Sequence, residues 1–441
     1  MSSNRTNATT QRVDATTRGN KLPLTAAQRN RRVVAAVVGT MSAGLLVAGC
    51  GPMLTASAGP GNGSSEARIA VSPAPGGAPV EVAKPVVITA DKGRLVDVAV
   101  VGAGGTLPGT TSDDGKTWTS LPGAELAYDA TYQVQASAVD SDGKTAQLKN
   151  SFQTINPAEK FTASAEYIDP DSTVGVGMPV AVKFDMPITD RAAVEKALVI
   201  KSSKPVEGAW SWNGEGTEVT FRPKEFWPAD TAVHVSGDLY GVKGTDKAYG
   251  ADNVDLNFKV GSSLIMKVDA NTLQMIVERN GQVVQTLPVT TGKPGFETRS
   301  GIKVISAKEG TVIMDSATTG TPAGSSESYR LEVNDAMRLT ESGEFIHAAP
   351  WSTYAQGSYS VSHGCIGLSS SDADWLYGMA SPGDVVVVTN TGRETDLGNG
   401  ITAWNEPWEQ WLKGSATGPL TTEKLNVPPP APSAPAPAPS A

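Results

Sequence analysis

Residues 82–260 consist mostly of short runs in which apolar and polar positions alternate, separated by turn-forming residues. The runs at 96–101 and 180–184 are examples. An alternation with a period of two predicts strands with one buried face, and short strands between regular turns are typical of β-sandwiches. The pattern therefore predicts two β-sandwich modules, the first over 82–157 and the second over 158–260.

The pattern changes after residue 260. Runs at 264–268 and 273–279 predict strands, and the Asn280-Gly281 pair that follows is the signature of a two-residue hairpin turn. A short helix is expected at 372–379. These features predict a third domain over 261–391, and the fold class of the whole chain is mostly β.

The segments around these domains differ from them in composition. Residues 51–81 are rich in Gly, Pro, Ala and Ser, which predicts a flexible spacer. Residues 427–441 are almost entirely Pro, Ala and Ser, which predicts a disordered or polyproline tail. Residues 392–426 predict a helical extension that packs on the third domain, because three tryptophans are spaced as on one helix face: Trp404, Trp408 and Trp411.

Residues 1–50 have the features of an export signal. The basic stretch at 29–32 precedes an apolar run over 33–49, and small residues lead into Cys50. This ending resembles a bacterial lipobox, in which Cys50 would carry a lipid. The alternatives are an uncleaved transmembrane anchor and a lipid-free signal peptide. Each of them places the bulk of the protein outside the cytoplasm, and the lipobox anchors it to the outer face of the cytoplasmic membrane.

Charge is unevenly distributed along the chain. Residues 1–49 carry seven Lys or Arg and one acidic residue, which leaves 29 basic and 44 acidic residues after them. Nucleic-acid binding needs a basic surface. The excess negative charge beyond residue 49 therefore argues against a nucleic-acid partner.

Histidine and cysteine are scarce, and they are concentrated in one region. The chain has three histidines and two cysteines, and His347, His363 and Cys365 lie within 19 residues of one another. His234 lies in an alternating run, where a structural role is expected. If Cys50 is acylated, Cys365 has no disulfide partner in its own chain. A lone exported thiol is exposed to oxidation, which indicates that it has a function.

A cysteine nucleophile explains this grouping. With a pKa of about 8.5 only a few per cent of a thiol is ionised at neutral pH, so it needs an imidazole to take its proton. His363 could share a strand face with Cys365, and His347 could reach it from a neighbouring strand. Gly364 would let backbone amides converge as an oxyanion hole. A zinc site and purely structural roles are the alternatives for these residues.

His347 together with Ser362-His363-Gly364-Cys365 resembles the signature of the L,D-transpeptidases of bacterial peptidoglycan. The similarity covers roughly residues 80–415 and includes the segments 280–284, 291–293, 313–316, 349–351 and 404–411. It is closest to the actinobacterial branch, whose members carry two immunoglobulin-like modules before the catalytic domain. The resemblance thus implies two immunoglobulin-like β-sandwiches, then a β-rich catalytic domain with a short helix and a C-terminal helical extension.

The resemblance also implies roles for individual residues. Cys365 would be the nucleophile and His347 its base, oriented by a backbone carbonyl near Ala348, while His363 would shape the oxyanion region with the amides of Gly364 and Cys365. The residues expected on the substrate side are Tyr329, Met314, Trp351, Ser362 and Gly367. Two positions depart from the family pattern, because Gly367 replaces a usual Asn and Thr319 replaces a common Tyr. Both departures are expected to adjust the fit of substrate or inhibitor.

The implied reaction is acyl transfer in two steps. Cys365 attacks the L-centre carbonyl of the third residue, a diamino acid, in a donor tetrapeptide stem, and D-alanine leaves. The diamino acid side-chain amine of a second stem then attacks the thioester and forms a 3→3 cross-link. No cofactor or metal is needed, and carbapenem β-lactams are expected to acylate the thiol. Attack by water would instead make the protein an L,D-carboxypeptidase.

Other classes of protein fit the sequence less well. A sortase needs an Arg soon after its Cys, and the nearest downstream is Arg393. Papain-like hydrolases place the Cys before the His, whereas both His347 and His363 precede Cys365. A non-catalytic scaffold that binds the cell wall is the remaining alternative.

Overall fold

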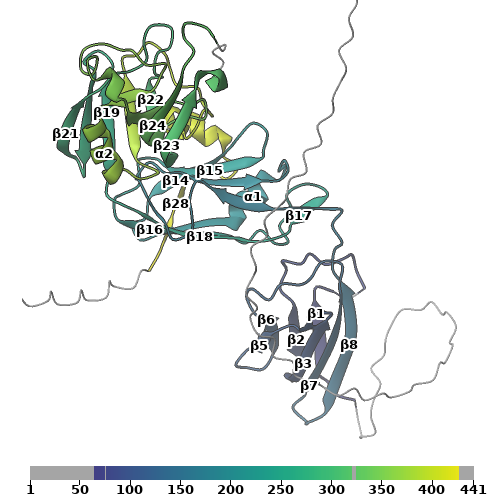
Figure 1. The fold of residues 1–441 in the computed structure, drawn as a ribbon. Helices are drawn as coiled ribbons and strands as arrows, with labels where there is room; N and C mark the ends of the chain where they lie inside the picture. The colour runs from purple at the N-terminus through teal and green to yellow at the C-terminus, as the bar shows by residue number, and fades with distance from the viewer. Residues whose placement is uncertain (1–63, 75, 320–323, 427–441) are drawn as a thin grey trace, which may run out of the picture. The chain divides into compact units, whose positions relative to one another are not determined.

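The computed structural model describes residues 64–74, 76–319 and 324–426 (Figure 1). The predicted fold class is confirmed, because strands dominate and the helices are few and short. No helix in the described ranges is both long enough and apolar enough to cross a membrane. The predicted lipidation residue Cys50 and the tail at 427–441 lie outside the described residues.

The first β-sandwich module consists of two four-stranded sheets. Their buried faces share one cluster of apolar side chains, which includes Ile88, Trp118 and Val134. The sheets have the strand orders β1-β2-β6-β5 and β4-β3-β7-β8, with β1 (Arg68–Ser72), β2 (Val87–Asp91), β3 (Arg94–Gly102), β4 (Gly105–Thr106), β5 (Gly109–Thr111), β6 (Thr117–Ser120), β7 (Thr131–Val139) and β8 (Thr145–Gln153).

The spacer predicted over 51–81 is corrected by strand β1. Arg68–Ser72 pairs antiparallel with β2, with Arg68 opposite Asp91 and Ser72 opposite Val87. It is an outer strand of its sheet, and none of its side chains is fully buried. A strand with so weak an apolar face gives little signal against a Gly- and Pro-rich background.

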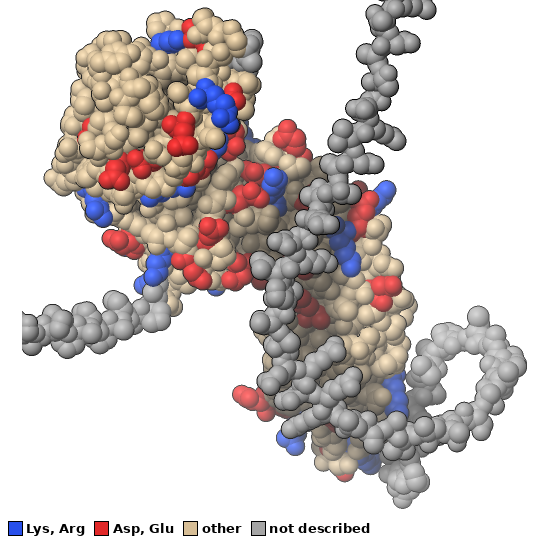
Figure 2. Space-filling model, in the orientation of Figure 1, with Lys and Arg blue, Asp and Glu red and all other residues tan. Residues whose placement is uncertain are grey.

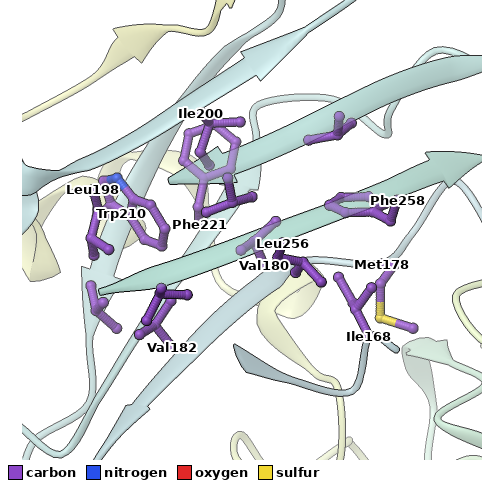
Figure 3. Packing of buried hydrophobic residues seen from close by; sticks show 14 of the residues in the cluster. Ile168, Met178, Val180, Val182, Leu198, Ile200, Trp210, Phe221, Leu256 and Phe258 are labelled. Carbon is purple, nitrogen blue, oxygen red and sulfur yellow. The ribbon is translucent and has the colours of Figure 1, made fainter. Parts of the chain in front are cut away.

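The second module encloses the largest aromatic core of the described residues. Trp210 and Phe221 meet edge to face at 5.5 Å, and Phe258 lies in the same cluster (Figure 3). Its sheets have the orders β10-β12-β15-β14-β28 and β11-β18-β16-β13-β29. The elements are β9 (Glu159–Phe161), β10 (Ala163–Glu166), β11 (Thr173–Val174), β12 (Val180–Phe184), α1 (Arg191–Ala197), β13 (Leu198–Ser202), β14 (Glu207–Trp212), β15 (Glu218–Pro223), β16 (Thr231–Gly237), β17 (Ala248–Gly250), β18 (Val254–Val260), β28 (Leu420–Thr421) and β29 (Glu423–Lys424).

The third domain contains a five-stranded and a four-stranded sheet. Apolar side chains from both sheets and from helix α2 form its core. The predicted hairpin turn is present, because Asn280 and Gly281 both have positive φ, 50° and 77°. The sheets have the orders β21-β20-β19-β27-β22 and β23-β24-β25-β26. The elements are β19 (Leu264–Asp269), β20 (Gln274–Arg279), β21 (Gln282–Pro288), β22 (Gly301–Val304), β23 (Ala307–Asp315), β24 (Arg330–Arg338), β25 (Phe345–Ala348), β26 (Ile366–Leu368), α2 (Ser370–Met379) and β27 (Val385–Thr389).

The C-terminal extension packs on the second module and also contacts the third domain, as expected, where Asn405 exchanges two hydrogen bonds of 2.7 Å with the backbone of Ile302. Its strand β28 pairs with β14 and its strand β29 pairs with β13, so each of them extends one of the two sheets of the second module. The guanidinium of Arg222 lies 5.1, 5.2 and 4.9 Å from the ring centroids of Trp404, Trp408 and Trp411. The tryptophans therefore enclose a largely buried cation, an arrangement that the spacing of the rings alone does not reveal. Helix α3 spans only Trp408–Trp411, so the extension is less helical than expected.

Surface charge is mixed on the face shown in Figure 2. Acidic and basic side chains are interspersed there among uncharged residues. Several of the exposed charges are paired, for example Lys224 with Glu207 and Lys267 with Glu278.

Candidate active site

Two neighbouring strands bring His347 and Cys365 to one face of a sheet. Strands β25 and β26 run parallel, with Ile346 opposite Ile366 and His347 opposite Gly367. Cys365 immediately precedes β26. Because side chains alternate along a strand, His347 and Cys365 point to the same side, one diagonal step apart.

His347 is a buried imidazole held in one orientation. Its Nδ1 lies 2.8 Å from the carbonyl oxygen of Ala348, the contact expected from the sequence. Nδ1 therefore donates its hydrogen, and Nε2 keeps a lone pair that can accept a proton. Burial lowers the pKa of His347 below its ordinary value, so the ring is neutral near pH 7. A neutral, oriented imidazole has the properties of a general base.

The thiol of Cys365 is also buried. Its Sγ lies 4.0 Å from Sδ of Met314 and 3.7 Å from the carbonyl oxygen of Gly343. Burial raises the pKa of Cys365 to about 12, which a backbone hydrogen bond at Phe345 partly offsets. The resting residue is therefore a neutral thiol. Within the part of the chain that the structure describes, neither His347 nor His363 is hydrogen-bonded to Sγ of Cys365.

His363 points to an acidic residue that sequence analysis missed. Its Nε2 lies 2.7 Å from Oε2 of Glu327, and the same oxygen accepts a hydrogen bond from Nζ of Lys293. The imidazole also packs on the rings of Phe296 and Tyr329, at centroid distances of 4.5 and 4.9 Å. The hydrogen bonds from Lys293 and His363 lower the pKa of Glu327. One signal was available, because Glu327 is the only acidic residue between Asp315 and Glu332.

The turn before Cys365 is held by its own side chains and by the neighbouring loop. Gly364 has a φ of 124°, and its carbonyl accepts a hydrogen bond of 2.7 Å from Thr298 Oγ1. Ser362 Oγ donates to the carbonyl of Cys365 at 2.6 Å and accepts from the amide of Gly364 at 3.1 Å. The amide of Gly364 is thus used inside the turn, whereas an oxyanion hole would need it directed at substrate. Ser362 accordingly braces the turn in addition to its expected place beside substrate.

A pocket of about 220 Å³ opens over the thiol and collects most of the predicted site residues. Nearly half of the Trp351 side chain is exposed at the pocket, and burial raises the pKa of Tyr329. The predicted residues that line the pocket are Met314, Tyr329, His347, Trp351, Ser362, His363, Cys365 and Gly367. Gly364 lies in the turn behind them.

Gly367 has a structural explanation. Its amide and carbonyl both pair with Thr290, at 2.9 and 3.0 Å, so the two backbones approach closely. A Cβ at this position would lie 2.9 Å from Thr290 Cγ2 and 3.0 Å from the Cβ of Ala349. The side chain of the usual Asn is therefore excluded unless these neighbours move. Thr319, the other departure, ends the short 3₁₀ helix Ser316–Thr319.

A buried charge cluster that sequence analysis also missed lies beneath the nucleophile turn. Oε2 of Glu344 accepts a hydrogen bond of 2.6 Å from Nζ of Lys303, and Oε1 accepts one of 2.9 Å from Arg299. The side chain of Lys303 is completely buried, and burial lowers its pKa. Glu344 lies directly under Gly364, where a Cβ would be 3.5 Å from Cγ of Glu344.

The other sequence alternatives can be compared with the geometry. The described residues contain no group of three or more His, Cys, Asp or Glu side chains arranged to hold a metal ion. His234 lies on the second module and pairs with Asp255 at 2.9 Å. Its place outside the pocket fits a structural role.

The sequence of the chain is similar to those of two protein families and of several known proteins. Residues 77–243 match the family model of a bacterial Ig domain, and residues 264–388 match that of the L,D-transpeptidase catalytic domain. L,D-transpeptidase 2 of Mycobacterium tuberculosis is 40% identical over 79% of this chain and 85% of its own. L,D-transpeptidase 5 of that species is 34% identical over 80% of this chain and 78% of its own.

Solved structures are similar over about half of the chain. An L,D-transpeptidase in complex with imipenem is 36% identical, with a TM-score of 0.45 over 51% of this chain and 97% of that chain. L,D-transpeptidase 3 of Mycobacterium tuberculosis in complex with a faropenem-derived adduct is 32% identical, with a TM-score of 0.43 over 52% of this chain and 97% of that chain.

Proposed function

Because the chain belongs to the L,D-transpeptidase family, we propose that it forms 3→3 cross-links between peptidoglycan stem peptides through a thioester at Cys365. The observation that carries this proposal is the common face of His347 and Cys365 in one pocket. A nucleophile and an oriented base beside each other are what acyl transfer by a cysteine requires.

In the first step the thiol of Cys365 gives its proton to Nε2 of His347 as Sγ attacks the donor carbonyl. The bond between Sγ and the carbonyl carbon forms, and the bond from that carbon to the D-alanine nitrogen breaks. The proton on His347 passes to the departing nitrogen, so the ring is neutral again when the thioester is complete. The carbonyl of Ala348 keeps Nε2 available throughout.

The burial of Cys365 determines when the proton moves. With a thiol pKa of about 12, a free thiolate at pH 7 costs about 7 kcal/mol. The pKa of His347 is lowered as well, so a resting ion pair between the two residues is disfavoured. We therefore propose that proton transfer accompanies attack on the carbonyl and does not precede it.

In the second step the side-chain amine of an acceptor diamino acid attacks the thioester. The new carbon–nitrogen bond forms, the carbon–sulfur bond breaks, and Sγ regains a proton. If water attacks instead, the product is a tripeptide stem and the protein acts as an L,D-carboxypeptidase. A wall-binding scaffold with no acyl transfer is the further alternative, and the usual Asn missing at Gly367 is the feature that favours it.

We propose that carbapenems acylate Cys365 in the same way as the donor stem. The support comes from relatives, which have been seen with imipenem and with a faropenem-derived adduct. The mostly apolar pocket, with Trp351 and Met314 in its lining, offers a surface for such a bicyclic molecule.

We also propose that residues 1–50 direct export and that a lipid on Cys50 anchors the protein to the outer face of the cytoplasmic membrane. The support is the sequence of a basic stretch, an apolar run and small residues before Cys50. Labelling cells with an alkyne fatty acid should tag the protein, and a Cys50→Ser variant should lose the tag.

Intact-mass analysis with a carbapenem tests the nucleophile. The full chain should gain one adduct, and the Cys365→Ala variant should gain none. An adduct that persists in the variant, or a folded and reduced protein that gains none, would contradict the proposed role of Cys365.

A further inference from the structure

Lys293, Glu327 and His363 form a polar cluster that the acylation step does not use. The carboxylate of Glu327 lies between the other two side chains and contacts both. His363 lines the pocket over the thiol, whereas Lys293 and Glu327 are not part of the lining. His347 already supplies the base for Cys365, so the cluster calls for another explanation.

The contacts of His363 fix which of its nitrogens is free. Nε2 lies 2.7 Å from a carboxylate oxygen, so Nε2 carries the hydrogen and Nδ1 keeps the lone pair. Phe296 and Tyr329 contact the ring and restrict its rotation. A carboxylate that holds the imidazole hydrogen on one nitrogen makes the other nitrogen a proton acceptor.

The second step of the proposed reaction has two protons to remove. An alkyl amine with a pKa of about 10.4 is an ammonium ion at pH 7, and only about 4 in 10,000 molecules are neutral. One proton must leave before the nitrogen can attack, and another leaves as the amide forms. His347 can hold only one of them at a time.

We infer that His363, positioned by Glu327, takes the first of these protons from the acceptor ammonium. This inference rests on the proposed function. The nitrogen–hydrogen bond of the ammonium breaks, its electron pair stays on the acceptor nitrogen, and the proton binds Nδ1 of His363. The neutral amine then attacks the thioester, while His347 takes the second proton and returns it to Sγ.

The charges around His363 allow its ring to accept a proton and to release it again. Glu327 stabilises the imidazolium that forms, and Lys293 shares the carboxylate, which limits that stabilisation and lets the proton leave again. The other titratable groups that line the pocket are Tyr329, His347, Tyr354 and Cys365. Burial raises the pKa of Tyr329 and lowers that of His347, so both are neutral near pH 7, and Cys365 carries the acyl group in this step. Glu327 is a positioning residue in this scheme, and His363 is the group that touches substrate.

The experiment measures how the thioester at Cys365 partitions between cross-linking and hydrolysis. The full chain is given a disaccharide-tetrapeptide as donor and acceptor, and mass spectrometry measures the ratio of cross-linked dimer to hydrolysed tripeptide between pH 7 and 9.5. Both products arise from the same thioester, so the rate of the first step cancels. Glu327→Ala and Glu327→Asp are compared with Glu332→Gln, which changes an exposed carboxylate on strand β24 of the same hairpin.

At pH 7 the ratio should fall by about tenfold or more in Glu327→Ala, which is less than the 10²–10⁴ contributed by a general base itself because Glu327 only positions His363. Glu327→Asp should regain part of it, and Glu332→Gln should match the parent. As pH approaches the pKa of the acceptor amine, more amine is already neutral, so Glu327→Ala should converge on the parent. A merely structural loss would persist at every pH. A ratio that stays at the parent value at pH 7, or a deficit independent of pH, would overturn the inference.

The same data separate this inference from the proposed function. A parent that makes dimer, with Glu327→Ala unchanged, refutes the role of Glu327 and leaves the transpeptidase intact. A parent that makes only tripeptide refutes cross-linking, and the inference falls with it because no amine is then used.

Discussion

Replacing Glu344 by Gln would leave a buried positive charge beneath the nucleophile without its counter-ion. The carboxylate of Glu344 accepts hydrogen bonds from the completely buried Lys303 at 2.6 Å and from Arg299 at 2.9 Å. Arg299 has a second partner in Asp396, at 2.8 Å. Glu344 is the only carboxylate that pairs with Lys303 in the described residues, so Lys303 bears most of the perturbation.

Removing one member of a buried ion pair typically costs about 3–5 kcal/mol, because the other charge remains desolvated. We expect Glu344→Gln to lower the free energy of unfolding by about that amount. Glu344→Gln combined with Lys303→Met removes both charges and should cost less than the single change. The thiol should respond too, because Glu344 raises the pKa of Cys365 and Lys303 lowers it. Glu344→Gln should therefore make the thiol more acidic, and Lys303→Met should make it less so.

Alkylation of Cys365 by iodoacetamide measures both effects. In a Cys50→Ser background one thiol remains, and its protection against alkylation in increasing urea reports unfolding at the site. Without urea, the dependence of the rate on pH reports the thiol pKa. A loss of less than about 1 kcal/mol in Glu344→Gln, or single variants that shift the thiol pKa in the same direction, would refute this view of the cluster.

His347, Gly367 and the buried carboxylate of Asp384 can each be tested by a single substitution. His347→Gln should slow carbapenem acylation of Cys365 by about 10²–10⁴, the range for a lost general base, as stopped-flow absorbance would show; a change under tenfold would contradict its role. Gly367→Asn should lower both acylation and stability, because a Cβ there meets Thr290 and Ala349 at 2.9 and 3.0 Å; a variant as stable and active as the parent in thermal and acylation assays would contradict that packing. Burial raises the pKa of Asp384 from 3.8 to about 7, so the folded state binds a proton that the unfolded state has lost. Protonated Asp384 therefore stabilises the folded state fully below about pH 4, and this stabilisation is lost as the pH rises to 7. Asp384→Asn should remove up to about 4 kcal/mol of the pH dependence of the free energy of unfolding, as measured by urea titrations. An unchanged pH slope would exclude Asp384 as its source.

Local sequence patterns predicted the features that depend on neighbouring residues. Asn280-Gly281 predicts its hairpin because few other pairs adopt positive φ at two successive positions. The number of residues between His347 and Cys365 is large enough for the chain to come back along a neighbouring strand. The parallel pairing of β25 with β26 has that geometry. The predicted pocket residues came from the family resemblance, and most of them line one cavity.

Features that depend on tertiary contacts between residues distant in sequence were missed. Glu327 meets His363 across 36 positions, and Glu344 meets Lys303 across 41. Such pairs cannot be recognised from a sequence pattern. Most charged residues are solvated, so the sequence alone does not indicate which of them are buried and paired. The shared partner of the three tryptophans in the extension was missed for the same reason, since Arg222 lies in another module.

Trapping the donor stem on the enzyme tests the central claim most directly. The full chain is mixed with a tetrapeptide donor, quenched in acid and analysed by intact mass, beside Cys365→Ala. A tripeptidyl thioester is expected on Cys365 with loss of one D-alanine, and it should convert to a 3→3 dimer when acceptor is in excess. An active preparation that releases D-alanine without any adduct dependent on Cys365 would contradict that claim.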